Sequence, residues 1–360
     1  MKILVYFNSM APAGGIERVI SSHIKFMAAN HEVILVTHDR KPSFYELPPN
    51  VKHESIDIDL ELNMASRFVR MKQIATSFIS IIKKIRQKKR QFQPDIIYVP
   101  SPLTTLLSYI AFRGGRKILV TEHSSFSAYN SFYKKVASFL YRKVGLLTVP
   151  TTMDSEFYKS VGVNNEYLPN PLPFNPEQQS SLENKTVLHV GRFTDDKRHL
   201  ELLKIWSLSN AKDNGWKLKL IGKGENDALI RAKITELRLE ESAVITPPTK
   251  NIISEYLASS VFALTSRAEG FGLVLAEAMS CGVPCISYKV PSGPRDIIED
   301  GVNGFLVENN NAEVFAEKIN ELCRDFELRQ QMGKNAKNSV QKFSEEEVSS
   351  KLNELIDKNF

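Results

Sequence analysis

The sequence of 360 residues is poor in cysteine, with only Cys281, Cys285 and Cys323. Three scattered cysteines cannot build a disulfide framework, and no second Cys or His pair stands beside Cys281 and Cys285 to complete a zinc site. We interpret them as packing residues of a cytosolic chain. No apolar run approaches the ~18 residues that a membrane-spanning helix needs, and the N-terminus has no signal-peptide pattern. These absences exclude a disulfide-stapled or membrane-spanning protein.

The Gly-x-Gly-x-x-Gly fingerprint of nicotinamide-dinucleotide enzymes is also missing. Gly222-Lys223-Gly224 follows an apolar run but has no third glycine, which counts against such an enzyme. The content of hydrophobic residues, 42%, and of charged residues, 24%, is that of an ordinary globular protein, so global disorder is excluded.

Short apolar runs alternate with longer helical stretches along most of the chain. Such runs are typical of parallel strands covered on both faces, which indicates a doubly wound α/β architecture. The pattern stops at the proline-rich segment 167–185 and then restarts, so we expect two Rossmann-like domains in tandem, 1–166 and 167–343. Residues 344–360 form a predicted helix that crosses back onto the first domain. The expected strands lie within 2–7, 32–38, 95–100, 117–123, 146–151, 186–192, 218–224, 261–266 and 284–289.

Charge is divided unevenly between the two halves. Residues 1–168 carry 23 Lys and Arg against 13 Asp and Glu, a net +10, whereas residues 169–360 carry a net −4. Segment 67–94 holds nine basic residues, no acid, and apolar residues at helical spacing, which predicts a basic amphipathic helix or a broken pair. A core-packed helix with a solvated basic face would give the same pattern. The residues that we assign to an anionic membrane surface are Lys83, Lys84, Arg86, Lys88, Lys89 and Arg90. Nucleic acid is disfavoured because no recognisable binding module is present.

Two motifs suit the binding of a phosphate group. Gly14 and Gly15 open a helix after the first strand, where backbone N–H groups can approach an anion. Arg192 and Lys197 stand five residues apart at the end of the first strand of the second domain and can both reach one diphosphate. Taken alone, a glycine pair before a helix is more often a plain connection, and the two cations could equally be those of a solvated loop.

Segment 266–284 is the most informative. Glu269 precedes a Gly-Phe-Gly loop, and Glu277 follows eight residues later among apolar neighbours. We expect Glu269 at the mouth of a helix and Glu277 one to two turns inside it. Two carboxylates so placed can accept hydrogen bonds from opposite ends of one elongated polyhydroxylated ligand. A capping Glu and a surface Glu are the alternative, which the apolar neighbours of Glu277 disfavour.

The segment 269–277 resembles the Glu-x7-Glu motif of the large GT4 family of retaining glycosyltransferases, which have the GT-B fold. Further segments resemble that family in the same order along the chain: 14–18, 121–123, 168–172, 191–197, 221–226 and 291–307. The match covers roughly residues 1–345. It implies a nucleotide-sugar site in the cleft between two Rossmann-like domains.

The resemblance implies a role for each matching residue. Glu277 would bind the ribose, and Glu269 the hydroxyls of the donor sugar. Arg192 and Lys197 would hold the diphosphate from one side and Gly15 from the other, and His123 would contact the donor sugar near the reaction centre. Backbone groups at the helix mouth would line the donor, namely those of Gly270, Phe271, Gly272 and Leu273. Without the other motifs of the family, a single histidine after a strand, such as His123, would be interpreted as structural.

We expect a metal-independent, retaining transfer of a hexose or N-acetylhexosamine to a lipid-linked glycan or polysaccharide acceptor, forming an α-linkage in bacterial surface polysaccharide. A UDP donor is favoured over GDP because 292–307 looks like that of UDP-sugar members, although Pro247 and Pro248 replace the family's usual glycine turn near the base. Asp57-Ile58-Asp59 is formally a metal-binding Asp-x-Asp, but an alternating polar strand explains it better. The expected location is cytoplasmic, at the inner face of the plasma membrane. A nucleotide-sugar epimerase and a non-catalytic nucleotide-sugar-binding subunit remain alternatives.

Overall fold

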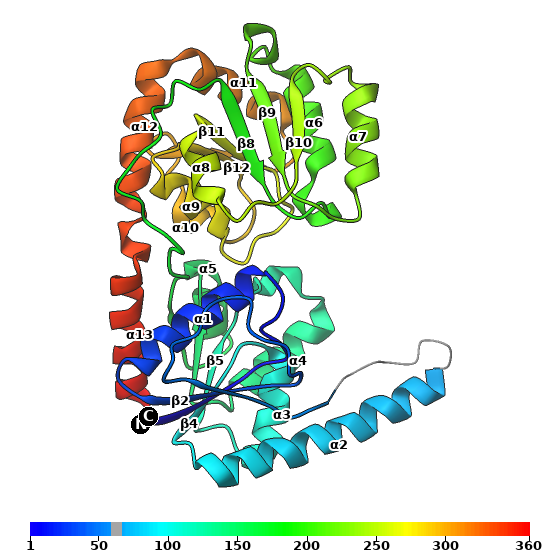
Figure 1. Cartoon of the computed structure of the whole chain (residues 1–360), viewed down its shortest axis with the longest axis vertical. Coiled ribbons are helices and arrows are strands. Elements are labelled where there is room, and N and C mark those ends of the chain that lie inside the picture. Colours follow the sequence, from blue (N-terminus) through cyan, green and yellow to red (C-terminus); the bar gives the residue numbers. More distant parts are fainter. Residues whose placement is uncertain (59–66) are drawn as a thin grey trace. The chain divides into compact units, whose positions relative to one another are not determined.

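The computed structural model describes residues 1–58 and 67–360, with the side chains of all of these except 67–76, 128 and 132. The chain forms two compact units (Figure 1). Unit 1 contains Met1–Pro171 and Glu345–Phe360, and unit 2 contains Leu172–Ser344. The first division lies five residues beyond the boundary expected after residue 166.

Unit 1 is built on a seven-stranded parallel sheet of order β3-β2-β1-β4-β5-β6-β7. Its strands are β1 (Lys2–Tyr6), β2 (Glu32–Thr37), β3 (Lys52–Ser55), β4 (Ile96–Val99), β5 (Ile118–Thr121), β6 (Leu146–Val149) and β7 (Asn165–Tyr167). Its helices are α1 (Gly15–Ala28), α2 (Arg67–Phe92), α3 (Pro102–Phe112), η1 (Phe126–Ala128), α4 (Ser131–Tyr141), α5 (Thr152–Ser160) and α13 (Glu345–Asn359).

Helices cover both faces of this sheet (Figure 1). On one face α1 and α13 pack together, with Ile24 and Leu352 in one apolar cluster and an ion pair of 2.6 Å between Lys25 and Glu345. On the other face α2, α3, α4 and α5 place their inner side chains in a second cluster, which includes Ile85 and Tyr141. The interior strands β1, β2, β4, β5 and β6 are therefore buried on both faces, as doubly wound sheets require.

Unit 2 repeats the plan with a six-stranded parallel sheet of order β10-β9-β8-β11-β12-β13. Its strands are β8 (Thr186–Val190), β9 (Lys217–Ile221), β10 (Ala243–Thr246), β11 (Val261–Leu264), β12 (Cys285–Tyr288) and β13 (Gly304–Val307). Its helices are η2 (Asp195–Lys197), α6 (His199–Leu208), η3 (Lys212–Asn214), α7 (Asp227–Glu236), α8 (Ile252–Leu257), α9 (Leu273–Ser280), α10 (Pro294–Ile297), α11 (Ala312–Arg324), α12 (Phe326–Ser339) and η4 (Gln341–Phe343).

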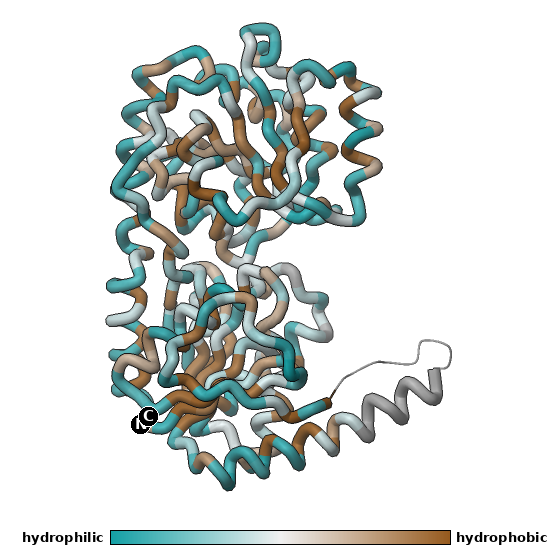
Figure 2. Tube along the Cα trace, viewed as in Figure 1, coloured by the Kyte–Doolittle hydropathy of each residue, from teal (hydrophilic) through white to brown (hydrophobic). Residues whose placement is uncertain are grey.

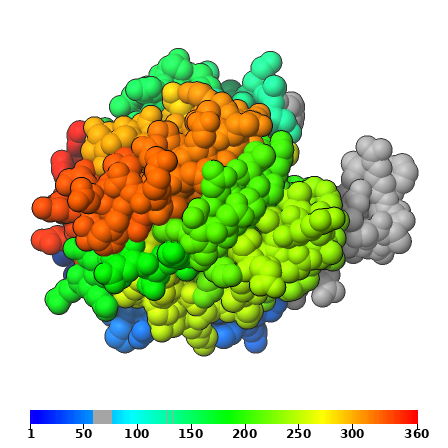
Figure 3. All heavy atoms as spheres, turned by 90° about the horizontal axis from the view of Figure 1, so that it is seen from above, coloured from blue at the N-terminus to red at the C-terminus, as the bar shows by residue number. Residues whose placement is uncertain are grey.

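The apolar residues gather in the strands of each unit (Figure 2). In unit 2, the helices α6, α7 and α11 share one cluster with one face of the sheet, and α8 and α9 share another with the opposite face. The segments that contain α7 and α11 lie at the surface of the unit, yellow-green and orange in Figure 3. Cys281 and Cys285 are free and buried, in keeping with a packing role.

Each sheet has a switch point where the strand order reverses direction, between β1 and β4 in unit 1 and between β8 and β11 in unit 2. Open α/β sheets bind ligands in the crevice at the carboxyl ends of the strands at such a point. Among the described residues, no helix is both long enough and apolar enough to span a bilayer.

Candidate functional site

The loops that follow β8, β9 and β11 contact one another closely at the carboxyl ends of the central strands of unit 2. The loop after β8 receives the loop after β9 so closely that a Cβ on Gly222 would lie 2.0 Å from the carbonyl oxygen of Gly191. A Cβ on Gly224 would lie 2.5 Å from the carbonyl oxygen of Phe193. Phe193 N donates to Lys223 O at 3.0 Å. Only glycine allows this approach, and it fixes the course of the chain from 191 to 193.

The turn Asp195–Lys197 is tied to the loop that follows β11. Arg267 N donates to Asp196 O at 2.7 Å, and Thr265 Oγ1 donates to Lys197 O at 3.2 Å. This junction brings Lys197 Nζ to 2.6 Å from Glu269 Oε1. The two side chains are 21% and 10% exposed, so the pair is partly desolvated and stronger than a surface ion pair.

Arg192 extends from the same loop. Its side chain is exposed and forms no hydrogen bond or ion pair with the rest of the described chain. Lys197 uses one of its three N–H donors on Glu269, which leaves the others for a ligand. The site therefore offers a fork of free guanidinium donors and a partly neutralised ammonium, a combination that suits a multiply charged anion.

The loop from Glu269 to Gly272 is held from beneath by segment 291–293. Ser292 Oγ donates to Glu269 O at 3.0 Å, and Gly293, at φ 80°, lies so close that a Cβ there would be 2.6 Å from Phe271 O. Phe271 is buried with its ring 5.1 Å from that of Phe343. Gly272, at φ 91°, then turns the chain into α9, whose first residue is Leu273.

Glu277 lies in the second turn of α9 and is 5% exposed. Tyr256 of α8 donates its hydroxyl to Glu277 Oε2 at 2.7 Å. Burial, and then the nearby Glu277 charge, raise the pKa of Tyr256 well above its usual value, so the phenol stays a donor. Glu277 is thus a positioned, buried carboxylate.

Two buried histidines lie beneath these loops. His189 of β8 donates from Nδ1 to Ala263 O at 2.8 Å, and its ring contacts that of His199 edge to face, with the ring centres 4.6 Å apart. Burial lowers the pKa of His189 to about 4 and that of His199 to about 2. Both rings are neutral at pH 7, and His199 also packs against Phe193.

The other predicted site residues lie in unit 1. Gly15 begins α1, and a Cβ there would meet nothing within 4 Å. His123 follows β5, and burial lowers its pKa to about 4. Burial also lowers the pKa of His23 to about 3, and the nearby His123 lowers it further. Neither ring nitrogen of His123 has a hydrogen-bond partner among the described residues.

A buried carboxylate fixes the backbone at His123. Glu122 accepts hydrogen bonds from His123 N at 3.0 Å, Ser124 N at 3.1 Å, Tyr129 Oη at 3.0 Å and Tyr141 Oη at 2.6 Å. Burial raises the pKa of Glu122, while these donors act against the rise.

The six cations assigned to a membrane surface do not share one environment. Lys84 donates to the carbonyl oxygen of Ile56, and Lys88 pairs with Glu54 at 2.5 Å, so both turn towards the edge strand β3. Arg86 and Lys89 donate to carbonyl oxygens near the end of α3. Lys83 and Arg90 are exposed. Lys84 and Lys88 therefore use their charges within unit 1, and the assignment of the six cations to a membrane surface stays a prediction. Arg67, Arg70 and Lys72 of the same basic stretch have side chains outside the described set.

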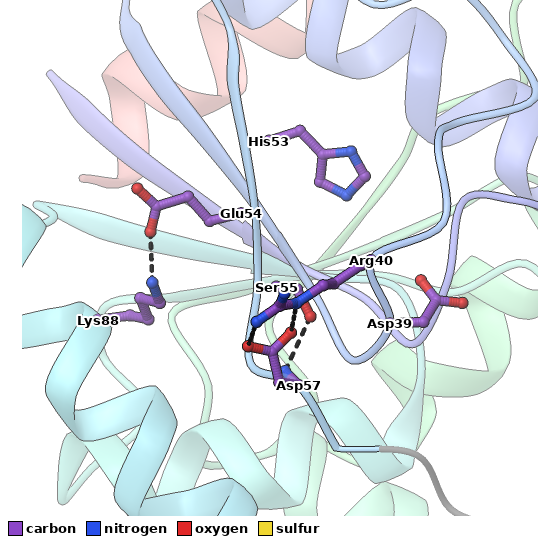
Figure 4. A pocket seen from close by; sticks show the side chains of 7 residues that line it. All are labelled: Asp39, Arg40, His53, Glu54, Ser55, Asp57 and Lys88. Carbon is purple, nitrogen blue, oxygen red and sulfur yellow. Dashed lines mark hydrogen bonds and ion pairs between the residues drawn. The ribbon is translucent and has the colours of Figure 1, made fainter.

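A polar pocket of about 350 Å³ lies at the carboxyl ends of β2 and β3 (Figure 4). Four of its charged side chains form two ion pairs, Arg40 with Asp57 at 2.5 Å and Lys88 with Glu54. The strand β3 ends at Ser55, so Asp57 lies in a loop, at φ 52°, and not on the strand that the alternating pattern suggested. Asp59 lies outside the described residues. No cluster of three or more His, Cys, Asp or Glu with metal-binding geometry occurs in the described ranges.

Sequence reasoning missed several residues that shape the site. Ser292 and Gly293 lie in the quoted segment 291–307 but received no role. Tyr256 and His199 carried no signal of their own, because their partners Glu277 and His189 are distant in sequence.

Two family models together span most of the chain. The model described as Glycosyltransferase Family 4 matches residues 13–173, and the model described as Glycosyl transferases group 1 matches residues 173–339. The chain is a member of glycosyltransferase family 4. Its two Rossmann-like units are those of the GT-B fold.

Relatives and solved structures agree with this assignment. The chain is 28% identical over 368 residues, 99% of each chain, to the amylovoran biosynthesis glycosyltransferase AmsD of Erwinia amylovora. It is 26% identical over 358 residues, 96% of this chain and 95% of the other, to a Campylobacter jejuni α-1,4-N-acetyl-D-galactosaminyltransferase named for a diNAcBac-PP-undecaprenol glycan. A mutant of TarM from S. aureus, solved with fondaparinux, α-GlcNAc-glycerol and UDP, has a TM-score of 0.78 at 16% identity and covers 98% of this glycosyltransferase and 99% of TarM.

Proposed function

We propose that this glycosyltransferase moves a hexose or N-acetylhexosamine from a UDP-sugar to a lipid-linked glycan or polysaccharide, with an α-linkage, in the synthesis of bacterial surface polysaccharide. The observation that carries the proposal is the set of charges in unit 2: the Lys197–Glu269 pair, the unpaired Arg192 and the buried Glu277. The amylovoran enzyme, the undecaprenol-linked acceptor named for the Campylobacter enzyme, and the UDP bound by TarM support the classes of product, acceptor and donor.

Each of these residues has a distinct role in the proposed reaction. Arg192 and Lys197 stabilise the negative charge that grows on the departing UDP, which is the main electrostatic demand of the reaction. Glu269, with its second oxygen free of Lys197, accepts hydrogen bonds from hydroxyls of the donor sugar. Glu277 accepts from the ribose. We assign His123 a contact with the donor sugar and Gly15 a backbone contact with the diphosphate.

The proposed transfer retains the configuration of the donor. The bond from the anomeric carbon to the β-phosphate oxygen breaks while a bond to the acceptor oxygen forms on the same face of the sugar. The acceptor's hydroxyl proton passes to the departing phosphate oxygen, so no side chain acts as a covalent nucleophile. Protein cations neutralise the diphosphate, and we propose that no divalent metal is required.

The acceptor places the proposed reaction at the inner face of the plasma membrane, with the chain bound peripherally. Two features of unit 1 support this location: the net charge of +10 on residues 1–168, and the absence of acids from segment 67–94.

A transfer assay tests the proposal. The purified chain is incubated in EDTA with labelled UDP-glucose, UDP-galactose, UDP-GlcNAc or UDP-GalNAc and a lipid extract rich in undecaprenyl-diphosphate glycans. We expect label from one donor to enter the lipid fraction, with an α-anomeric signal by NMR. Epimerised donor without lipid product would instead support an epimerase, and donor binding without turnover a non-catalytic subunit.

A further inference from the structure

The helix layer formed by α2, α3 and α4 has an outer surface unlike that of an ordinary soluble domain. α3 packs against both neighbours, and the inner side chains of all three helices, including Ile85, Leu107 and Tyr141, fill the core beneath them. The outer side of such a layer normally carries polar residues. Here it does not.

Five large apolar side chains lie on the outer side of α3 and α4. On α3 they recur at spacings of three and four residues, and on α4 at a spacing of three, so each set occupies one helical face. Phe139 is the most prominent, with 61% of its surface exposed. We call this set the apolar ridge: Leu103, Leu106, Ile110, Val136 and Phe139.

Cations border the apolar ridge. Arg86 of α2 donates to Ile110 O at 3.1 Å, and Lys143 Nζ lies 4.8 Å from the centre of the Phe139 ring. Charges in the adjoining loop gather closely enough to lower the pKa of Lys89, after the larger effect of its burial. Among the described side chains, the exposed cations of this part of the chain are Lys83, Arg90, Arg113, Arg116, Lys117, Lys135, Arg142 and Lys143.

Acidic residues are nearly missing from this part of the sequence. Between residues 67 and 153 there are 16 Lys and Arg but only two acids, Asp95 and Glu122. Glu122 is buried, and the Asp95 carboxylate accepts a hydrogen bond from Lys2 N. An apolar surface bordered by charge of one sign fits an anionic, non-polar partner.

We propose that the apolar ridge and its bordering cations dock this glycosyltransferase onto an anionic lipid bilayer. The apolar side chains enter the boundary between headgroups and acyl chains, and the cations bind the phosphates of the headgroups. The inference rests on the proposed function, since it names the surface by which the chain meets its lipid-linked acceptor. A second copy of the chain is a poorer occupant, because a twofold contact would set the same cations against one another.

Vesicle flotation of the full chain tests the docking surface. The vesicles contain phosphatidylcholine alone or a 70:30 mixture with phosphatidylglycerol. The apolar variant is Ile110→Ser/Phe139→Ser, matched by Leu208→Ser/Leu229→Ser, which removes two similarly exposed apolar side chains from unit 2. The charge variant is Arg113→Glu/Lys143→Glu, matched by Lys204→Glu/Lys334→Glu, also exposed residues of unit 2.

We expect the unaltered chain to bind the anionic vesicles and to be released by salt. Each ridge variant should bind them at least ~10-fold more weakly, and both controls should bind normally. The depth to which residue 139 enters the bilayer is measured by tryptophan fluorescence in the variants Phe139→Trp and Leu229→Trp. The natural Trp206 and Trp216 are buried, so we expect lipid to quench only the added tryptophan. Brominated lipid should quench the added fluorescence of Phe139→Trp alone.

Several outcomes would overturn the proposal. These are equal binding to both vesicle types, equal binding by the ridge variants, and a concentration-dependent dimer that only the apolar variant loses. UDP titration of each protein separates this proposal from the proposed function. If the unaltered chain binds UDP but not the anionic vesicles, the docking surface alone is refuted, whereas if it binds the vesicles but not UDP, the donor site alone is refuted.

Discussion

Lys197 Nζ lies 2.6 Å from Glu269 Oε1, and the two residues come from loops that follow different strands, β8 and β11. These strands flank the switch point of the unit 2 sheet. The pair is therefore where a doubly wound sheet places its ligand, and it leaves Lys197 with free donors and Glu269 with a free acceptor oxygen.

Removing either partner of this pair should impair transfer more than it impairs folding. We expect Glu269→Gln and Lys197→Met to lower kcat/KM by about 10²–10³-fold, since each loses a charged contact to the reacting groups. Steady-state transfer assays measure the loss. Lys318→Met breaks a comparable pair with Glu321, 2.7 Å long on α11, and serves as the control. Equal losses in Lys318→Met would show that the effect is only structural.

Substitution of the buried Glu277 tests its proposed contact with the ribose hydroxyls. Glu277→Gln should weaken UDP binding about 10-fold, the cost of one charge-assisted hydrogen bond, but should leave the affinity for a 2′,3′-dideoxy analogue nearly unchanged. Tyr256→Phe should show the same pattern with a smaller loss, because the substitution removes the hydroxyl that orients the Glu277 carboxylate. Competition calorimetry gives these affinities. Parallel losses for both nucleotides would remove Glu277 from the ribose contact.

Gly293 allows a direct test of the support beneath the Glu269 loop. Gly293→Ala should reduce nucleotide-sugar affinity, because the new Cβ meets Phe271 O at 2.6 Å and displaces the loop. Gly301→Ala is the matched control, since Gly301 has a similar φ, 76°, with no atom within 4 Å of the new Cβ. Both variants place an alanine at a positive φ, where its backbone is strained, but only Gly293→Ala adds the contact with Phe271. Identical affinities would contradict the account of the loop.

The buried histidine pair predicts a pH dependence of stability. An unfolded histidine binds its proton near pH 6.5, whereas His189 and His199 have pKa values lowered by burial to about 4 and about 2. Between pH 6.5 and 4 the unfolded state therefore binds more protons, and the free energy of unfolding falls as the pH falls.

The substitution His199→Phe, which keeps an aromatic ring against Phe193, should make this slope shallower between pH 6.5 and 5. Urea unfolding at several pH values measures it. A slope identical to that of the unaltered chain would mean that His199 does not titrate on unfolding.

The division between what the sequence predicted and what it did not has a simple physical origin. All nine strands predicted from apolar runs are interior to the two sheets, and the four not predicted from such runs, β3, β7, β10 and β13, are the edges. The alternating pattern suggested a strand around residues 57–59, just beyond the observed end of β3. Interior strands are buried on both faces and give continuous apolar runs, whereas an edge strand such as β3, with sequence KHES, is half exposed and gives none.

The site divides in the same way. Glu269, Glu277, Arg192 and Lys197 carried motif signals, but the contact between Lys197 and Glu269 depends on backbone hydrogen bonds between two loops, such as Arg267 N to Asp196 O. Periodicity in one segment does not encode such contacts. For the same reason it did not reveal that Lys84 and Lys88 turn towards β3.

The most direct test of the central claim is titration calorimetry of the full chain with UDP, GDP and uridine in EDTA. The account predicts that UDP binds without divalent metal and more tightly than GDP. It also predicts that Arg192→Ala weakens UDP binding about 10-fold while uridine binding is unchanged, since only UDP carries the diphosphate. UDP binding that requires Mg²⁺, or an Arg192→Ala loss equal for UDP and uridine, would contradict a diphosphate held by protein cations.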